Sequence, residues 1–95
     1  MAAYVIADIE VIDAARYEEY KKLSAPTVAA HGGKYIVRGG PAEVLEGPWS
    51  PGRVVVLQFD SVERAREWWT SDIYDSVKGI RHSSAKSKLI LVEGI

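Results

Sequence analysis

The sequence contains no cysteine, which excludes disulfides, thiolate nucleophiles and thiolate metal sites. Its two histidines, His31 and His82, do not stand at the spacing of metal ligands. No G-x-S-x-G segment is present, and GGPAEVLEG fits neither a P-loop nor a dinucleotide-binding fingerprint. We therefore expect neither a metal ion nor a cofactor.

A surplus of one charge sign is also missing. Twelve Lys and Arg residues stand against thirteen Asp and Glu, for a net charge of -1. Nucleic acids and anionic bilayers are bound by surfaces rich in basic residues, so we expect neither as a partner. The opening MAAYVIADIEV reads as a strand and lacks the basic start and long apolar segment of a signal peptide or membrane span. The expected location is the cytoplasm.

The chain length is suited to a single domain, residues 1–95. Hydrophobic residues make up 47% of the 95 and charged residues 26%, which is typical of an ordered globular protein. A domain of this size buries only somewhat over ~60% of the surface that its unfolded chain exposes, so its core alone gives marginal stability. We expect a second copy of the chain to supply further burial, as a homodimer.

Alternating apolar residues and turn signals predict four strands. The expected strands are Ala3–Val11, Lys34–Arg38 with a continuation at Glu43–Glu46, Arg53–Phe59, and KLILVEG after a polar SSAKSK loop.

Helical spacing predicts two helices between these strands. The first is expected to run from a cap at Asp13 to about His31, with a kink or a division at Pro26. The second begins at Ser61, and Ser71 caps its continuation after a break. Its expected apolar stripe is Val62, Ala65, Trp69 and Ile73, followed by Val77 and Ile80 in the continuation. Of the adjacent Trp68 and Trp69, one should lie in the core and the other at an interface or pocket wall.

The order βαββαβ is that of the α+β ferredoxin-like fold, in which an antiparallel four-stranded sheet carries two helices on one face. Three of the strands carry apolar residues in both alternating sets, so neither face of the sheet reads as simply solvated. Two sheets packed face to face would cover the second face.

Several segments together resemble one protein family. They are HGGKYIVRGG, VLEGPWSPGRVVVLQFDS, a helix with WW, S-x-x-Y and a later Arg, and LILVEG. In order and spacing they resemble the family called domain of unknown function 1330 (DUF1330). The resemblance implies a dimeric α+β barrel, made of two ferredoxin-like subunits with facing sheets. The wider superfamily includes cofactor-independent monooxygenases, lactone isomerases and haem enzymes, but a shared fold does not transfer chemistry.

Arg38 and the glycines that follow it form the first candidate ligand-binding group. Gly39 and Gly40 permit a bulge, a left-handed residue or the close approach of another backbone. Arg38 is either an anion clamp or one half of an ion pair at an interface beside a bulge.

A second candidate group lies on the first helix, where Tyr20, Ser24, Thr27 and His31 share one face. If this face looks toward the sheet, it lines a pocket in which His31 transfers a proton. The alternative is that His31 only satisfies carbonyl groups in the last helical turn.

Tyr74 and Arg81 form a third group, because residues seven positions apart on a helix point the same way. They either bracket a carboxylate or enolate as catalytic groups, or pack and pair at a dimer edge.

Two further residues complete the candidates. Trp49 lies in the proline-restricted loop GPWSPG, and we interpret it as an anchor into the partner subunit. Asp8, in a central strand, is either a buried base with a raised pKa or the partner of an arginine.

Together these features predict a homodimer that binds a small anionic or aromatic metabolite between sheet and helices. Cofactor-independent proton transfer or monooxygenase-like chemistry is the enzymatic interpretation, by analogy of fold. The alternative is a non-catalytic binding or protein-interaction module.

Overall fold

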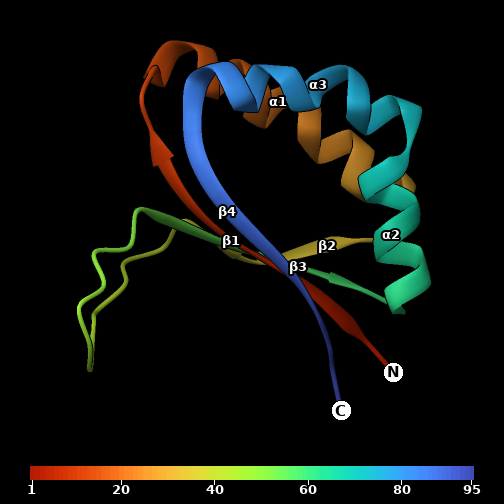
Figure 1. The fold of residues 1–95 in the computed structure, drawn as a ribbon. Helices are drawn as coiled ribbons and strands as arrows, with labels where there is room; N and C mark the ends of the chain where they lie inside the picture. Colours follow the sequence, from red (N-terminus) through yellow and green to blue (C-terminus); the bar gives the residue numbers. More distant parts are fainter.

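The computed structural model describes residues 1–95. Seven elements follow one another along the chain: β1 (Ala3–Val11), α1 (Ala14–Ala30), β2 (Lys34–Arg38), β3 (Arg53–Phe59), α2 (Val62–Thr70), α3 (Asp72–Ser84) and β4 (Ala85–Glu93). The strands form one antiparallel sheet in the order β2-β3-β1-β4. All three helices cover the same face of this sheet (Figure 1). The predicted ferredoxin-like fold is confirmed.

Each helix begins at a side chain that accepts a hydrogen bond from a free backbone amide. Asp13 accepts from Arg16 N at 3.1 Å, and Ser61 accepts from Arg64 N at 3.2 Å. Ser71 ends α2 and also caps α3 by accepting from Tyr74 N at 3.2 Å. The second helix is therefore divided at Ser71, as the cap predicts. The first helix is a single element that continues through Pro26, so its predicted division is not observed.

Two predicted strand boundaries are wrong. Residues Glu43–Glu46 form no strand, because they belong to the connection 39–52, which leaves the sheet and projects away from the helix layer (Figure 1). We call this connection the arm. The SSAKSK segment is not a loop either: α3 ends at Ser84, and β4 begins at Ala85, opposite Val11. Because β1 is long, it supplies backbone pairing partners for this polar segment. The segment therefore forms part of a strand, although its composition is typical of a turn.

The core lies between the sheet and the helices. Its inner sheet face comes from alternate residues of β1 and β3, and its largest buried side chains include Trp68, Tyr74 and Phe59. Of the two adjacent tryptophans, Trp68 is the one in the core, at 2% exposure, whereas Trp69, which belongs to the predicted apolar stripe, is 37% exposed. Ile73 is also outside the core, at 47% exposure. The extended backbone of Ser71 resets the helical register, so that Tyr74 takes the inward position.

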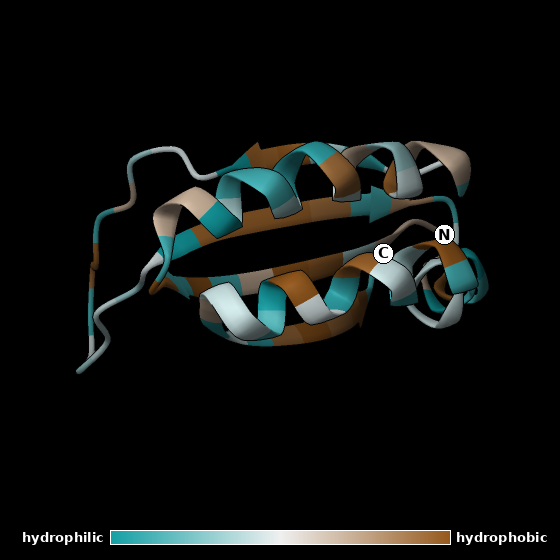
Figure 2. Ribbon diagram, turned by 90° about the horizontal axis from the view of Figure 1, so that it is seen from above, coloured by the Kyte–Doolittle hydropathy of each residue, from teal (hydrophilic) through white to brown (hydrophobic).

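The opposite face of the sheet carries an apolar row across all four strands. The register aligns Val37, Val56, Ile6 and Ile90 side by side on this face. Ile90 is 59% exposed and Ile6 is 36% exposed. On the other side of the molecule, the helices turn many hydrophilic residues outward above hydrophobic strands (Figure 2). One face of the sheet therefore has a cover within the chain and the other does not.

None of the three helices combines the length and the apolar character needed to span a membrane.

Candidate functional site

A pocket lies between the sheet and α1. Alternate residues of β1 and β3 form its apolar floor, and its aromatic walls come from Tyr17, Tyr20, Tyr35 and Trp68. The wall residue Trp68 is fixed in place because its Nε1 donates to Thr27 Oγ1 at 3.0 Å. The cavity volume open to water-sized molecules is about 40 Å³.

Four cationic side chains line the same pocket, and no Asp or Glu side chain does. The cations are Lys21, Arg38, Arg53 and Arg81. Lys21 has a carboxylate partner on the surface, Glu18 at 2.7 Å, and the only other ion pair in the chain joins Arg64 to Glu67. The three pocket arginines therefore lack a carboxylate partner, and their charge is available to an anion.

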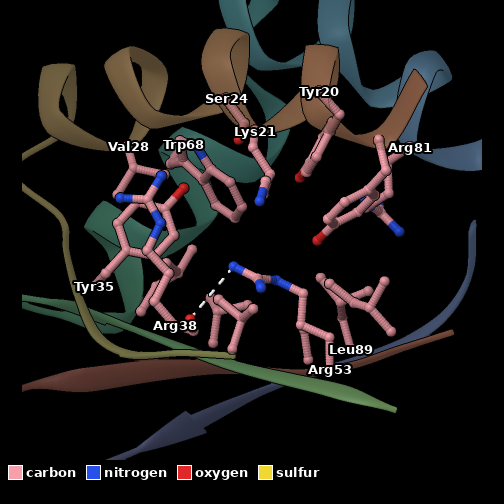
Figure 3. A pocket seen from close by; sticks show the side chains of 16 residues that line it. Tyr20, Lys21, Ser24, Val28, Tyr35, Arg38, Arg53, Trp68, Arg81 and Leu89 are labelled. Atoms are coloured by element: carbon pink, nitrogen blue, oxygen red, sulfur yellow. Dashed lines mark hydrogen bonds between the residues drawn. The ribbon is translucent and has the colours of Figure 1, made fainter. Parts of the chain in front are cut away.

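Arg53 reaches from the first residue of β3 into the centre of the pocket (Figure 3). Its Nη2 donates a long hydrogen bond of 3.4 Å to the backbone oxygen of Arg38. Its Nε is buried and has no hydrogen-bond partner. A buried donor without a partner is costly, so Arg53 retains a donor that a bound anion would satisfy.

Gly39 provides the room for this arginine. Its φ is +73°, and a Cβ at this position would lie 2.6 Å from Arg53 Cζ. Gly40 has no atom within 4 Å of its corresponding position. The bulge of β2 lies at Ile36, between Tyr35 and Val37, rather than at the glycines. Of the three alternatives for the glycine pair, Gly39 is therefore the left-handed residue. At Gly40 the packing leaves room for a side chain.

Arg38 lies at the edge of the pocket and its side chain is exposed. Its guanidinium carbon stands 4.2 Å from the centroid of the Tyr35 ring. This cation–π contact holds the charge over an aromatic wall of the pocket. No ion pair forms at Arg38 within the chain.

Tyr20, Tyr74 and Arg81 form a buried polar chain at the other end of the pocket. The hydroxyl oxygens of Tyr20 and Tyr74 are 2.9 Å apart, and Arg81 Nε donates to the Tyr74 hydroxyl at 3.3 Å. Arg81 also donates through Nη1 to Ser87 Oγ. Burial is the main cause that raises the pKa of Tyr20, and the neighbouring Tyr74 adds to it. Tyr20 is therefore a neutral phenol at physiological pH.

His31 does not line this pocket. It follows the last residue of α1, and its Nδ1 lies 3.1 Å from the backbone oxygen of Thr27. Because a carbonyl oxygen only accepts, Nδ1 carries the hydrogen. Tyr20, Ser24 and Thr27, on the same helical face, are buried as expected. The structure thus brings Tyr20 to the pocket and leaves His31 at the end of the helix.

Asp8 and Trp49 meet outside the pocket, on the side of the sheet away from the helices. Asp8 Oδ2 accepts from Trp49 Nε1 at 3.0 Å, and Asp8 Oδ1 accepts from Gly52 N at 2.8 Å. The Trp49 hydrogen bond is the main cause that lowers the pKa of Asp8, followed by the Gly52 amide. The hypothesis of a base with a raised pKa is therefore wrong for Asp8. The carboxylate instead fastens the arm to β1, while the Trp49 ring stays 57% exposed.

Sequence reasoning missed two contributors to the pocket, Arg53 and Tyr17. Arg53 stands two residues before Val55 and therefore shares the inner face of β3, so strict alternation would have found it. Tyr17 precedes Tyr20 by three positions and Ser24 by seven, which places it on the same helical face.

Fold and pocket together define an α+β protein of the ferredoxin-like class with a cationic, aromatic-walled pocket between sheet and helices. The chain belongs to the family described as Domain of unknown function (DUF1330), whose model matches residues 2–95. No curated protein matches it in sequence.

Three solved structures show the same fold. The RPA0582 protein of unknown function from Rhodopseudomonas palustris is 20% identical, with a TM-score of 0.82 over 99% of this chain and 82% of the other. SnoaB, a cofactor-independent oxygenase from Streptomyces nogalater, is 11% identical, with a TM-score of 0.70 over 99% and 93%. A dimeric protein of unknown function from Bacteroides fragilis is 8% identical, with a TM-score of 0.60 over 98% and 96%. At these identities the likeness establishes the fold alone.

Proposed function

We propose that this protein is a homodimer that binds a small aromatic anion in the pocket between the sheet and α1. One observation carries the proposal: four cations and four aromatic side chains line the pocket, and no carboxylate does. Aromatic walls favour a flat apolar body, and unpaired guanidinium groups favour a negative charge on it. A neutral or cationic ligand would leave this charge uncompensated.

The ligand enters by displacing side chains. A volume of about 40 Å³ holds no more than a few water molecules, so a metabolite needs additional room. Arg53 is the side chain best suited to move, because its guanidinium has no carboxylate partner and its hydrogen bond to the Arg38 backbone oxygen is long, 3.4 Å. Lys21 is also adaptable, since its ion pair with Glu18 lies on the surface, where such pairs contribute little.

The homodimer is supported by the uncovered apolar row on the sheet. Val37, Val56, Ile6 and Ile90 form a band across four strands that water would otherwise contact. A second copy that presents the same row would cover both bands. Trp49 fits the same proposal: Asp8 holds its indole nitrogen, and the ring remains 57% exposed for insertion into the partner.

A second candidate function is cofactor-independent proton transfer or oxygenation of the bound anion. The observation that favours it is the buried pair of phenols beside Arg81, in which Tyr74 and Arg81 keep their proposed catalytic roles. The likeness of fold to a cofactor-independent oxygenase is consistent with it. A non-catalytic binding module would instead bind the same anion without turnover.

Thermal unfolding with a panel of small phenolates and carboxylates tests the binding proposal. A ligand of the native state raises the melting temperature, and at a fixed ligand concentration a tighter ligand raises it more. We expect aromatic anions to stabilise the protein, Arg53→Gln to reduce the effect, and Arg64→Gln to leave it unchanged, since Arg64 pairs with Glu67 on the surface. If no aromatic anion raises the melting temperature, the proposal is wrong. Oxygen consumption with the best binder then separates catalysis from binding, and sedimentation tests the homodimer.

A further inference from the structure

Arg81, Tyr74 and Tyr20 form a hydrogen-bonded chain in which the donor of each bond can be assigned. Arg81 is 3% exposed and Tyr74 is fully buried, so neither side chain relies on water for its polar partners. A guanidinium only donates, and therefore the Tyr74 oxygen accepts from Arg81 Nε. The Tyr74 hydroxyl keeps its own hydrogen, and Tyr20 Oη, 2.9 Å away, is its one acceptor in the chain.

This direction sets the orientation of the Tyr20 hydroxyl. If Tyr20 donated to Tyr74, the buried Tyr74 hydrogen would have no acceptor, which costs about 1–3 kcal/mol. Tyr74 therefore donates to Tyr20, and the Tyr20 hydrogen is left for another acceptor. Tyr20 extends from α1 toward the space above Arg53 in Figure 3, and no side chain within the pocket accepts from it.

The protonation state of Tyr20 agrees with a donor role. Burial raises its pKa above the ordinary value for tyrosine, so the phenol does not act as a base near neutral pH. The charged and titratable groups that face it are Tyr17 and Lys21 on α1, Tyr35 on β2, Arg53 on β3, and Tyr74 and Arg81 on α3. All of these cations attract an anion to the position that the Tyr20 hydrogen faces.

We propose that Tyr20 donates its hydroxyl hydrogen to a single-oxygen anion of the ligand, a phenolate or an enolate, and that Tyr74 and Arg81 are positioning residues that direct this donor. The inference rests on the proposed function and names the ligand class of the same pocket. A phenolic donor forms its short, strong hydrogen bond with one oxygen that carries concentrated charge. Arg81 uses its Nε on Tyr74 and its Nη1 on Ser87, so the Tyr20 hydroxyl is the neutral donor at this end of the pocket and offers one hydrogen to one oxygen.

A nitrophenol is a suitable probe, because its phenolate absorbs visible light and its phenol does not. We expect the parent protein to bind 4-nitrophenolate and to lower the pKa of the bound phenol below that of the free compound. Tyr20→Phe should weaken phenolate binding about ten- to hundred-fold, the range for a hydrogen bond to a charged group. The same variant should change the affinity for 4-nitrobenzoate by much less.

Tyr74→Phe tests the positioning role. It leaves Tyr20 in place but removes the hydrogen bond that the Tyr20 oxygen accepts, so the hydroxyl is no longer held in one orientation, and we expect the pKa of the bound nitrophenol to return toward the free value. A purely structural Tyr74 would change the melting temperature and leave this pKa unaltered. Because Phe replaces Tyr with the loss of one atom, both variants retain the ring packing; if Tyr20→Phe does not fold, Tyr74→Phe alone decides by the same spectrum.

The outcomes separate this inference from the function on which it rests. Failure of the parent to bind either probe overturns the proposed function. Binding that Arg53→Gln weakens but that Tyr20→Phe leaves unchanged keeps the proposed function and overturns the role of Tyr20. Equal losses of nitrophenolate and nitrobenzoate in Tyr20→Phe overturn the assignment of the ligand as a single-oxygen anion.

Discussion

Replacing Gly39 by alanine should damage the fold and the pocket together. The residue has φ of +73°, a conformation that costs an alanine about 1 kcal/mol. Its new Cβ would lie 2.6 Å from Arg53 Cζ and 3.1 Å from Arg53 Cγ, so the arginine stem has to shift as well. We expect a loss of about 1–2 kcal/mol in the free energy of unfolding, or about 4–16 °C in melting temperature for a domain of this size. Arg53 also loses its present position in the pocket.

The matched control is Gly40→Ala at the next residue. Gly40 has no positive φ and no atom within 4 Å of the added carbon, so alanine there should be neutral or slightly stabilising. Thermal unfolding and 4-nitrophenolate titration of both variants supply the comparison. The reasoning is refuted if the two variants melt alike, and the link between Gly39 and the pocket is refuted if Gly39→Ala binds the anion as the parent does.

Three further predictions concern other parts of the chain. Hydrogen bonds from Trp49 and a backbone amide lower the pKa of Asp8. The stabilising contribution of this carboxylate is therefore complete above the ordinary pKa of 3.8 and is lost as the pH falls through the lowered pKa. Asp8→Asn should reduce the loss of stability between pH 5 and pH 2 in denaturant titrations. Ile90→Glu, at a position 59% exposed, should leave the folded subunit intact but weaken the proposed dimer in sedimentation equilibrium, and an unchanged association would contradict the proposed sheet-face interface. Gly33→Ala would place a Cβ 2.8 Å from Phe59 Cζ and should cost about 1–3 kcal/mol of unfolding free energy in urea titrations.

Most of the fold could be predicted because local signals agree with the tertiary structure. Asp13, Ser61 and Ser71 each cap the helix that follows them, as their short oxygen-bearing side chains indicate. The prediction failed where pairing at long range decides the outcome. The SSAKSK segment has the composition of a loop, yet β1 extends far enough to pair with it from Ala85 onward.

The helix register shows a second limit of sequence reasoning. Val62, Ala65, Trp69 and Ile73 fit a continuous helix, and Trp68 fits the apolar stripe less well. The break at Ser71 turns α3 relative to that pattern and brings Tyr74 inward in place of Ile73. A serine cap predicts that a new helix begins at that point, but it does not fix the direction of the new helix relative to the one before it.

The candidate site was predicted in its parts and not in its assembly. Tyr20, Tyr74, Arg81 and Arg38 were proposed as three separate groups, and the structure places Tyr20, Arg81 and Arg38 around one pocket, with Tyr74 hydrogen-bonded to the first two. Helical spacing predicts which residues of one element share a face, but the meeting of Tyr20 with Tyr74 depends on the packing of α1 against α3. No pattern within either helix specifies that contact.

The buried arginine gives the strongest reason to regard this pocket as a binding site rather than as ordinary core. Arg81 is 3% exposed and bonds to hydroxyl groups of Tyr74 and Ser87, with no carboxylate in contact. Removing a guanidinium from water costs several kcal/mol, and the two hydroxyl groups accept from its Nε and Nη1 without neutralising its charge. An acidic residue in place of Ser87 would neutralise that charge. Hydroxyl partners instead preserve a positive potential inside the pocket, and a ligand that carries the missing negative charge should stabilise the native state by binding there.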